Sequence, residues 1–198
     1  MKSALMLLAL LFAGCVQQGF AYEGISVSRV GDSFLVSRGG VNIYFEPSGI
    51  PAGPAVADYV FFSYDDCDKE SMIRISNENT TVIGPLKCVE GIQGHTYSMG
   101  QTDSLSFRDG TVRISSVPIE KGTGDKGNGY YVSVGGKSVY FIPASDSVPL
   151  VKQRIDVAFL PDAGPAALLK PKVVVPTMGN SDVFSKALDG SGIQVKAI

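Results

Sequence analysis

Three short segments of this sequence are apolar at every position and lack the alternation of a strand with one wet face. They are residues 59–62 (Tyr-Val-Phe-Phe), 157–160 (Val-Ala-Phe-Leu) and 173–175 (Val-Val-Val). A strand of this kind must be covered on both faces, as in the sheets of layered α/β proteins. The chain is therefore expected to contain sheets that are buried between other layers.

Shorter strands separated by glycine turns precede and follow these segments. Residues 25–30, 33–37 and 41–45 are rich in β-branched and aromatic side chains, and Gly31-Asp32 and Gly39-Gly40 separate them. Such turns indicate an antiparallel meander. Further strands are predicted at 81–83, 111–115, 130–134 and 137–142, the last two joined by the hairpin signal Gly135-Gly136.

Brief helical stretches alternate with the later strands of each half. They are predicted at residues 66–75, 147–153, 165–169 and 182–188. A meander followed by alternating strands and helices occurs twice along the chain. This order predicts one α/β domain in which two sheets pack face to face with helices outside, in four layers.

The composition agrees with one globular domain. The 198 residues are 44% hydrophobic and 18% charged, which excludes wholesale disorder. With 17 basic against 19 acidic residues, the chain lacks the surplus of positive charge that nucleic-acid binding requires.

The beginning of the chain resembles a leader for export. Lys2 precedes an apolar run at residues 4–13, which is shorter than the roughly 20 residues that span a bilayer. The run ends in Phe12-Ala13-Gly14-Cys15, which resembles a prokaryotic lipobox. A plain signal peptide cut after Ala21 is the alternative.

The lipobox reading divides the chain into three parts. They are a signal peptide with lipobox at 1–15, a tether at 16–23 and the folded domain at 24–198. It predicts lipidation of Cys15 and a location outside the cell membrane, anchored to its outer face. The membrane is then a partner through the lipid anchor, while a protein or small-molecule ligand is not identified.

Cys67 and Cys88 remain as an even pair in an exported protein, where disulfides persist. A disulfide and two buried, unpaired thiols are both compatible with the sequence. The bonded form would close a loop of about 20 residues and stabilise the fold by roughly 3 kcal/mol.

Several motifs appear in the order of a known family. They are residues 30–36 (VGDSFLV), 45–47 (FEP), 57–63 (ADYVFFS), 82–85 (VIGP), 129–132 (GYYV), 155–161 (IDVAFLP) and 170–176 (KPKVVVP). Together they resemble the metallo-β-lactamase superfamily, specifically its small metal-dependent hydrolases, over residues 25–188. The resemblance implies a four-layer αββα sandwich, here with shortened outer helices.

The resemblance also implies where a two-metal centre would lie, and this sequence has lost most of its ligands. The family's imidazole and carboxylate ligands lower the pKa of a bridging water. The chain has a single histidine, His95, which we expect to be a solvated loop residue. Eight positions correspond to the family's metal-ligand motifs: Asp32, Tyr64, Asp66, Asp68, Lys69, Lys121, Ala144 and Met178.

Five of these eight positions carry a carboxylate or a lysine, and two arrangements of them are open. In the first, Lys69 and Lys121 turn inward and form salt bridges with Asp66 or Asp68, replacing part of the lost metal charge. In the second, an oxygen-only site binds one divalent cation such as Ca²⁺ or Mg²⁺. Its ligands would be Asp32, Asp66, Asp68 and Asp146.

These observations favour a degenerate, non-catalytic member of the family that serves as a binding or structural protein, without catalytic residues or a cofactor. The alternative is a residual metal-dependent hydrolase that uses the oxygen-ligand site. A third hypothesis, compatible with the first, is a subunit of an envelope complex that binds a partner near the short segment 165–169. The glycine-rich segment 122–129 is predicted to be a flexible loop because it lacks the ending of a phosphate-binding loop.

Overall fold

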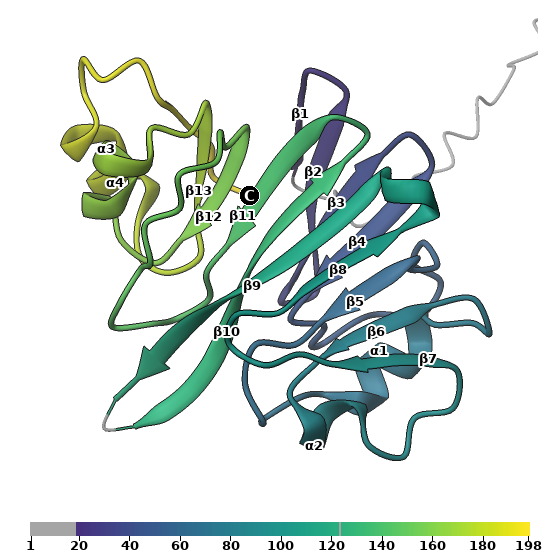
Figure 1. Ribbon diagram of the computed structural model, residues 1–198. Helices are drawn as coiled ribbons and strands as arrows, with labels where there is room; N and C mark the ends of the chain where they lie inside the picture. The colour runs from purple at the N-terminus through teal and green to yellow at the C-terminus, as the bar shows by residue number, and fades with distance from the viewer. Residues whose placement is uncertain (1–18, 123) are drawn as a thin grey trace, which may run out of the picture.

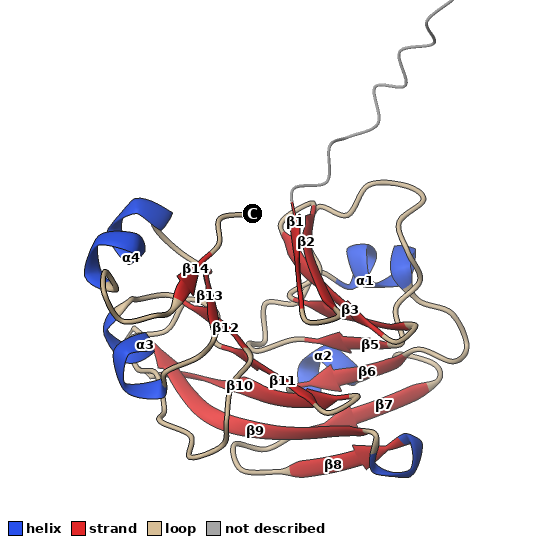
Figure 2. Ribbon diagram, turned by 90° about the horizontal axis from the view of Figure 1, so that it is seen from above, coloured by secondary structure: helices blue, strands red, loops and turns tan. Residues whose placement is uncertain are grey.

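The computed structural model describes residues 19–122 and 124–198 of the chain. The predicted leader, residues 1–15, and the lipidation residue Cys15 lie outside the described residues. The predicted architecture is confirmed: two sheets pack face to face, with helices outside both (Figures 1 and 2).

The first half of the chain forms one sheet, in which the spatial order of the strands is their order in the sequence. Strands β1 to β4 pair antiparallel, and β4 to β7 pair parallel. The strands are β1 (Gly19–Tyr22), β2 (Ile25–Val30), β3 (Ser33–Arg38), β4 (Val41–Phe45), β5 (Tyr59–Phe61), β6 (Thr81–Gly84) and β7 (His95–Ser98).

The second half of the chain repeats this topology in a second sheet. Strands β8 to β11 pair antiparallel, and β11 to β14 pair parallel. The strands are β8 (Ser104–Phe107), β9 (Val112–Lys121), β10 (Asp125–Val134), β11 (Lys137–Phe141), β12 (Val157–Leu160), β13 (Val173–Pro176) and β14 (Gln194–Val195).

Short helices complete the outer layers. The first sheet carries α1 (Lys69–Ile75) and α2 (Leu86–Val89), and the second carries α3 (Gly164–Leu169) and α4 (Ser181–Ala187) on its other side (Figure 2). A single 3-10 turn, η1 (Arg108–Gly110), joins β8 to β9. The predicted shortening of the outer helices agrees with these lengths of four to seven residues.

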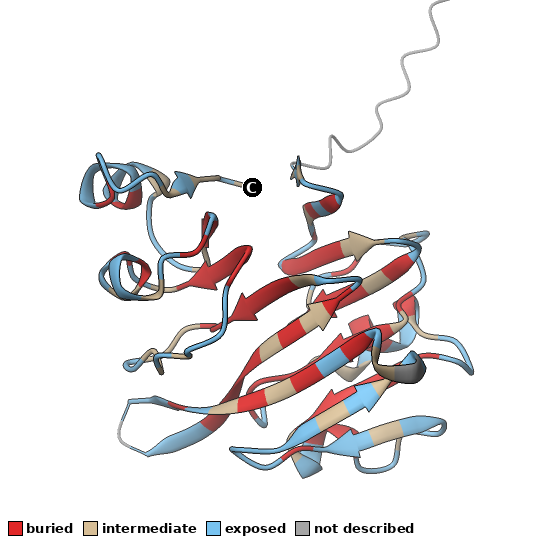
Figure 3. Cartoon of the chain, turned by 45° about the horizontal axis from the view of Figure 1, so that its top comes forward, coloured by how far each residue is buried: buried red, intermediate tan, exposed pale blue. Residues whose placement is uncertain are grey.

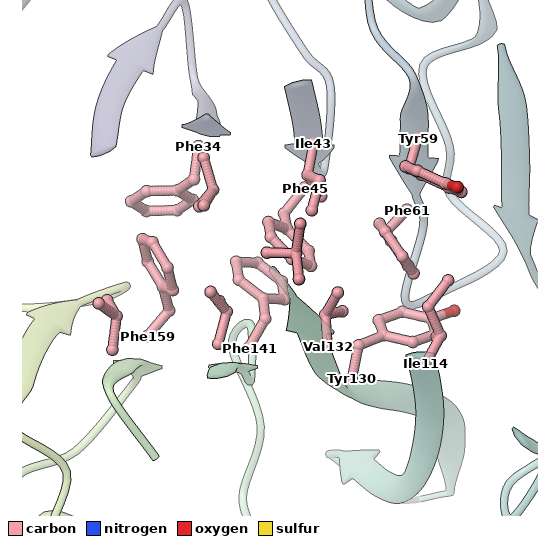
Figure 4. Close-up of a cluster of buried hydrophobic side chains, with 14 of the residues drawn as sticks. Phe34, Ile43, Phe45, Tyr59, Phe61, Ile114, Tyr130, Val132, Phe141 and Phe159 are labelled. Atoms are coloured by element: carbon pink, nitrogen blue, oxygen red, sulfur yellow. The ribbon is translucent and has the colours of Figure 1, made fainter. Parts of the chain in front are cut away.

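Aromatic side chains from both sheets form the central layer of the core. Phe45 of β4 stacks on Phe141 of β11 with ring centroids 4.5 Å apart, and on Phe61 of β5 at 5.0 Å (Figure 4). Phe34 meets Phe159 edge to face at 5.1 Å. The inner strands β3–β6 and β10–β13 are buried over most of their length, whereas the edge strands, the loops and the outer helix faces are more exposed (Figure 3).

Several local predictions differ from the structure. Residues 19–22 were expected in a tether, but they form β1, whose Phe20 and Tyr22 pack against the core. Residues 147–153, which the structure describes, do not form the predicted helix. Pro149 has no backbone N–H to donate within a helix, and its carbonyl oxygen accepts a hydrogen bond from the Tyr140 hydroxyl instead. His95 is exposed as expected, but it begins strand β7.

The segment 122–129 is also not the flexible loop that its glycines suggested. From Asp125 onward it belongs to β10, which pairs with β9 through a ten-residue register. Gly127 is needed there because an added Cβ would lie 2.5 Å from the Tyr64 ring. Glycine in this strand therefore marks a close approach to another part of the chain.

Candidate functional site

The candidate site lies at one end of the sandwich, which we call the mouth. It is the end where β2, β5, β9, β11 and β13 finish, and the implied metal positions lie at the ends of these strands or in the segments that follow them. The hairpin of β9 and β10 projects beyond the sheets at this end (Figure 1).

Tyr64 fills the centre of the mouth. Its side chain is buried against Gly127 of β10, and its hydroxyl donates a hydrogen bond of 3.0 Å to the carbonyl of Ala144. Burial raises the pKa of the Tyr64 hydroxyl, which keeps it protonated as a donor at neutral pH. Tyr64 and Ala144 both stand at implied metal-ligand positions, so two of these positions bond to each other.

Two more hydrogen bonds join the sheets beside Tyr64. The backbone N–H of Asn128 donates to the carbonyl of Ser63 at 2.9 Å, and the hydroxyl of Tyr130 donates to the carbonyl of Phe62 at 2.7 Å. Burial strongly raises the pKa of Tyr130. These two hydrogen bonds join the segment after β5 directly to β10. The polar groups of Asn128 and Tyr130 inside the mouth therefore stabilise the contact between the sheets.

Glu46 is a residue of the mouth that sequence analysis did not single out. It follows β4 with a φ of 50°, and its Oε1 accepts the backbone N–H of Ser63 at 2.8 Å. The pKa of its carboxyl group is raised to about 7, chiefly by desolvation; hydrogen bonding from Ser63 opposes this shift, and the nearby Asp66 adds to it. In the sequence, Glu46 could be noticed as a glutamate directly after a buried strand. The enclosure of its carboxyl group, however, depends on the segment after β5, which is distant in sequence.

A small charged cavity opens beside Tyr64. It has a volume of about 250 Å³ and is lined by Tyr64, Asp65, Asp66, Lys87, Asp125 and Lys126. Three carboxylates and two ammonium groups therefore surround a space between α2 and the hairpin of β9 and β10. Such a mixture suits a small ligand that carries both charges better than a simple anion.

The two lysines at implied ligand positions do not form the predicted salt bridges. Lys69 Nζ donates to the carbonyl of Glu90 at 2.8 Å, because Lys69 begins α1 and lies beside the segment after α2. Lys121 Nζ lies 5.8 Å from the centre of the Tyr64 ring. No ion pair among the described residues joins either lysine to Asp66 or Asp68, so this prediction was wrong.

The carboxylates of the alternative oxygen site are also engaged separately. Asp68 caps α1 by accepting the N–H of Ser71 at 2.9 Å, and this hydrogen bonding lowers its pKa. Asp146 Oδ2 accepts the N–H of Gly122 at 2.6 Å. Asp32 is exposed and lies 3.9 Å from the guanidinium of Arg29.

The residues present do not fit a metal centre of either kind. Within residues 19–122 and 124–198, no three His, Cys, Asp or Glu side chains converge as metal ligands. Of the eight implied positions, the mouth brings together Tyr64, Asp66, Lys121 and Ala144. Asp32, Asp68 and Lys69 have the other partners described above, and Met178 is half exposed in the loop before α4.

Cys67 and Cys88 form a disulfide with their Cα atoms 5.8 Å apart. This decides between the two arrangements that the sequence left open. The bond ties the loop carrying Asp65 and Asp66 to α2, so two of the three segments that line the charged cavity are held together.

Among the described residues, no helix has the length and apolar character that crossing a membrane requires. No protein-family model matches the sequence, and no curated protein is similar to it in sequence.

Solved structures resemble the chain in three dimensions. A candidate metal-dependent hydrolase from Parabacteroides distasonis superimposes with a TM-score of 0.74 at 18% identity, over 91% of this chain and 98% of that one. A candidate zinc-dependent hydrolase of the metallo-β-lactamase superfamily from Thermotoga maritima gives a TM-score of 0.55 at 16% identity, over 87% and 97%.

A larger enzyme contains a similar unit. The diiron β-hydroxylase CmlA of Streptomyces venezuelae gives a TM-score of 0.64 at 13% identity, over 90% of this chain. The chain spans about half of CmlA, 53% of its length. The repeated meander, the two face-to-face sheets and these superpositions lead to one conclusion: this chain has the metallo-β-lactamase fold.

Proposed function

We propose that this chain is a membrane-anchored extracytoplasmic protein that uses the metallo-β-lactamase fold as a non-catalytic binding or structural scaffold. The observation that carries the proposal is the contact between Tyr64 and Ala144. The Tyr64 ring packs against the opposite sheet and occupies space at the mouth. Its hydroxyl donates a hydrogen bond to the carbonyl of Ala144, which is another implied ligand position. Fold alone does not supply an activity, which depends on the residues at the site.

The position of β1 supports lipidation of Cys15 over a plain signal peptide. All four residues of β1 pair with β2, from Gly19 opposite Ser28 to Tyr22 opposite Ile25. Cleavage after Ala21 would remove three of these four residues, including Phe20, which packs against the core. Cleavage before Cys15 leaves the strand whole and supplies the anchor.

The charged cavity supports a binding role. Its carboxylate and ammonium groups lie on a loop, a helix and a hairpin that the disulfide and the bonds across the mouth hold in place. A rigid polar cavity needs little reorganisation to accept a ligand. The ligand class that fits is a small zwitterionic molecule.

A structural role in an envelope complex is supported by a different surface. Leu168 of α3 and Val183 of α4 leave more than half of their side chains exposed, at 68% and 63%. Exposed apolar side chains on adjacent short helices suit contact with another protein. This second role is compatible with the first and uses the outer face of the second sheet instead of the mouth.

Metal analysis of the mature protein, purified from membranes without chelators, tests the non-catalytic role. We expect no stoichiometric divalent cation and no hydrolysis of ester, phosphodiester or β-lactam substrates, with or without added Zn²⁺ or Mn²⁺. One or more ions per chain, together with hydrolysis that chelation abolishes, would establish the residual hydrolase instead.

Mass spectrometry of the same material tests the anchor. We expect the mature protein to begin at an acylated Cys15, and Cys15→Ser to release it from the membrane fraction. A mature chain that begins at Tyr22 would overturn the anchored form.

A further inference from the structure

The chain between the proposed anchor and the fold is very short. If Cys15 carries the lipid, four residue steps separate it from Gly19, the first residue of β1. An extended chain spans at most about 3.6 Å per residue, so the two Cα atoms are no more than about 14 Å apart. This inference rests on the proposed anchor, and it requires one particular part of the domain to lie against the bilayer.

That part of the domain is the mouth end of the first sheet at its β1 edge. Gly19 pairs with Ser28, and β2 ends two residues later at Val30, before the turn that carries Asp32. Arg29, which follows Ser28, lines a hollow of about 540 Å³ on the surface. The point where the anchor joins the fold and this hollow are therefore neighbours.

The other wall of the hollow is an apolar loop. It is formed by Gly49 and residues 51–55, and residues 47–57 contain no charged side chain. Pro51, Ala52, Ala55 and Val56 are exposed, with Val56 at 49%. A charge-free apolar loop exposed on a soluble surface usually marks a contact site.

The loop is held in shape by hydrogen bonds to its backbone. Arg74 Nη1 donates to the carbonyl of Ile50 at 2.9 Å, and the Tyr44 hydroxyl donates to that of Ala55 at 2.9 Å. Asn42 Nδ2 donates to the carbonyl of Val56 at 3.0 Å. These bonds leave the side chains outside, so presenting them to another surface costs little ordering entropy.

We propose that the loop of residues 49–56 and the neighbouring Arg29 form a surface that docks on the outer leaflet of the bilayer. The apolar side chains suit the boundary between headgroups and acyl chains, and the half-exposed guanidinium of Arg29 suits a lipid phosphate. The anchored domain would then have a fixed orientation, with this surface against the bilayer, instead of rotating freely about its lipid anchor.

Single tryptophans test this orientation, because the chain contains none of its own. Ala52→Trp places the probe on the docking loop, and Leu168→Trp places a matched, exposed probe on α3 at the opposite outer face (Figure 2). Each full-length, lipidated variant is reconstituted into vesicles of phosphatidylcholine and phosphatidylglycerol whose acyl chains carry bromine. Bromine quenches only a tryptophan that reaches the acyl region.

We expect Ala52→Trp to lose roughly half or more of its emission, because docked apolar side chains lie about 5–10 Å below the headgroup boundary. Leu168→Trp should keep its emission. Equal quenching of the two variants, or none in either, while both are acylated and sediment with the vesicles, would overturn the docking surface and leave the anchor intact. Absence of the acyl group would overturn the anchor itself, and the docking inference with it. Val56→Trp serves as a second probe of the loop if Ala52→Trp does not fold.

Discussion

The hydroxyl of Tyr64 and the carbonyl of Ala144, 80 residues apart in sequence, are joined by a hydrogen bond across the mouth of the sandwich. Tyr64 follows β5 of the first sheet, and Ala144 follows β11 of the second. Both residues lie three positions after buried strands, so the bond connects the two sheets where the core reaches the surface. The Tyr64 side chain, which links the two sheets, is therefore expected to stabilise the fold.

Removing the hydroxyl of Tyr64 should therefore weaken the fold slightly, and removing the ring should weaken it strongly. We expect Tyr64→Phe to lower the free energy of unfolding by about 1 kcal/mol, the usual net value of one hydrogen bond. Tyr64→Ala should cost about 3–5 kcal/mol, because a buried aromatic side chain is lost. Urea denaturation measures both, and Tyr131→Phe, which removes an exposed hydrogen bond to Arg154, is the control. An unchanged free energy of unfolding in Tyr64→Ala would show that the ring is not packed as described.

Glu46 should make stability depend on pH in an unusual direction. Its carboxyl pKa is raised from 4.5 to about 7 in the folded protein, chiefly by desolvation. The folded state therefore holds the proton more tightly, and the stability that this gives is lost as pH rises from about 4.5 through about 7. At about 1.4 kcal/mol per pKa unit, the effect amounts to about 3 kcal/mol.

The neutral variant Glu46→Gln should remove this dependence. We expect the variant to gain stability relative to the parent by about 3 kcal/mol between pH 4.5 and pH 8, as measured by urea denaturation at each pH. The contributions of all other carboxylates to the pH dependence are the same in the two proteins and cancel in the difference. A difference that stays constant across this range would show that the Glu46 carboxyl is solvated.

The disulfide should stabilise the domain through the loop that it closes. Cys67 and Cys88 are 21 residues apart, and closing a loop of this size is worth about 3 kcal/mol in the chain-entropy model. We expect the double substitution Cys67→Ser and Cys88→Ser to lower the free energy of unfolding by that amount. Dithiothreitol should destabilise the parent similarly and leave the double variant unchanged; a parent insensitive to reduction would contradict the prediction.

Much of the fold could be predicted from the sequence because the inner strands carry their own signal. Strands β2, β4 and β12 begin and end where their β-branched and aromatic runs do. The four strands that the sequence did not reveal, β1, β7, β8 and β14, lie at the edges of the two sheets. They are short and largely exposed, so pairing with a neighbour rather than an apolar pattern defines them.

The candidate site was harder to predict because its residues are far apart in sequence. Lys69 was expected to turn toward Asp66 or Asp68, but α1 directs it to Glu90. Glu46 lacked a distinctive pattern, since the raised pKa comes from its enclosure beside Ser63. Asp68 did have a local signal, an aspartate three residues before Ser71 at the start of a helix, which is typical of an N-cap.

The cap assignment for Asp68 predicts a modest effect on stability. Asp68→Ala should lower the free energy of unfolding by about 1 kcal/mol, because the N–H of Ser71 loses its acceptor. The pKa of Asp68 is lowered in the folded state, so the loss should be largest at neutral pH and shrink as pH falls through that pKa. Asp65→Ala, at an exposed position three residues earlier, is the control and should change the free energy of unfolding little. Equal losses at both positions would argue against a cap.

Gly127 provides the most direct test of how closely the two sheets approach at the mouth. A Cβ added there would lie 2.5 Å and 2.6 Å from two ring carbons of Tyr64 and 2.7 Å from the carbonyl oxygen of Ser63. Forcing such contacts in a packed core usually costs about 1–3 kcal/mol, so we expect Gly127→Ala to lower the free energy of unfolding by that amount. Gly164→Ala is the matched control, since its nearest contact would be an ordinary 3.4 Å. Combining Gly127→Ala with Tyr64→Ala should cost less than the sum of the two changes, because removing the ring relieves part of the clash. The relief should be incomplete, since the Ser63 carbonyl is backbone and stays in place. Strict additivity in this double-mutant cycle would mean that the Tyr64 ring does not rest on β10.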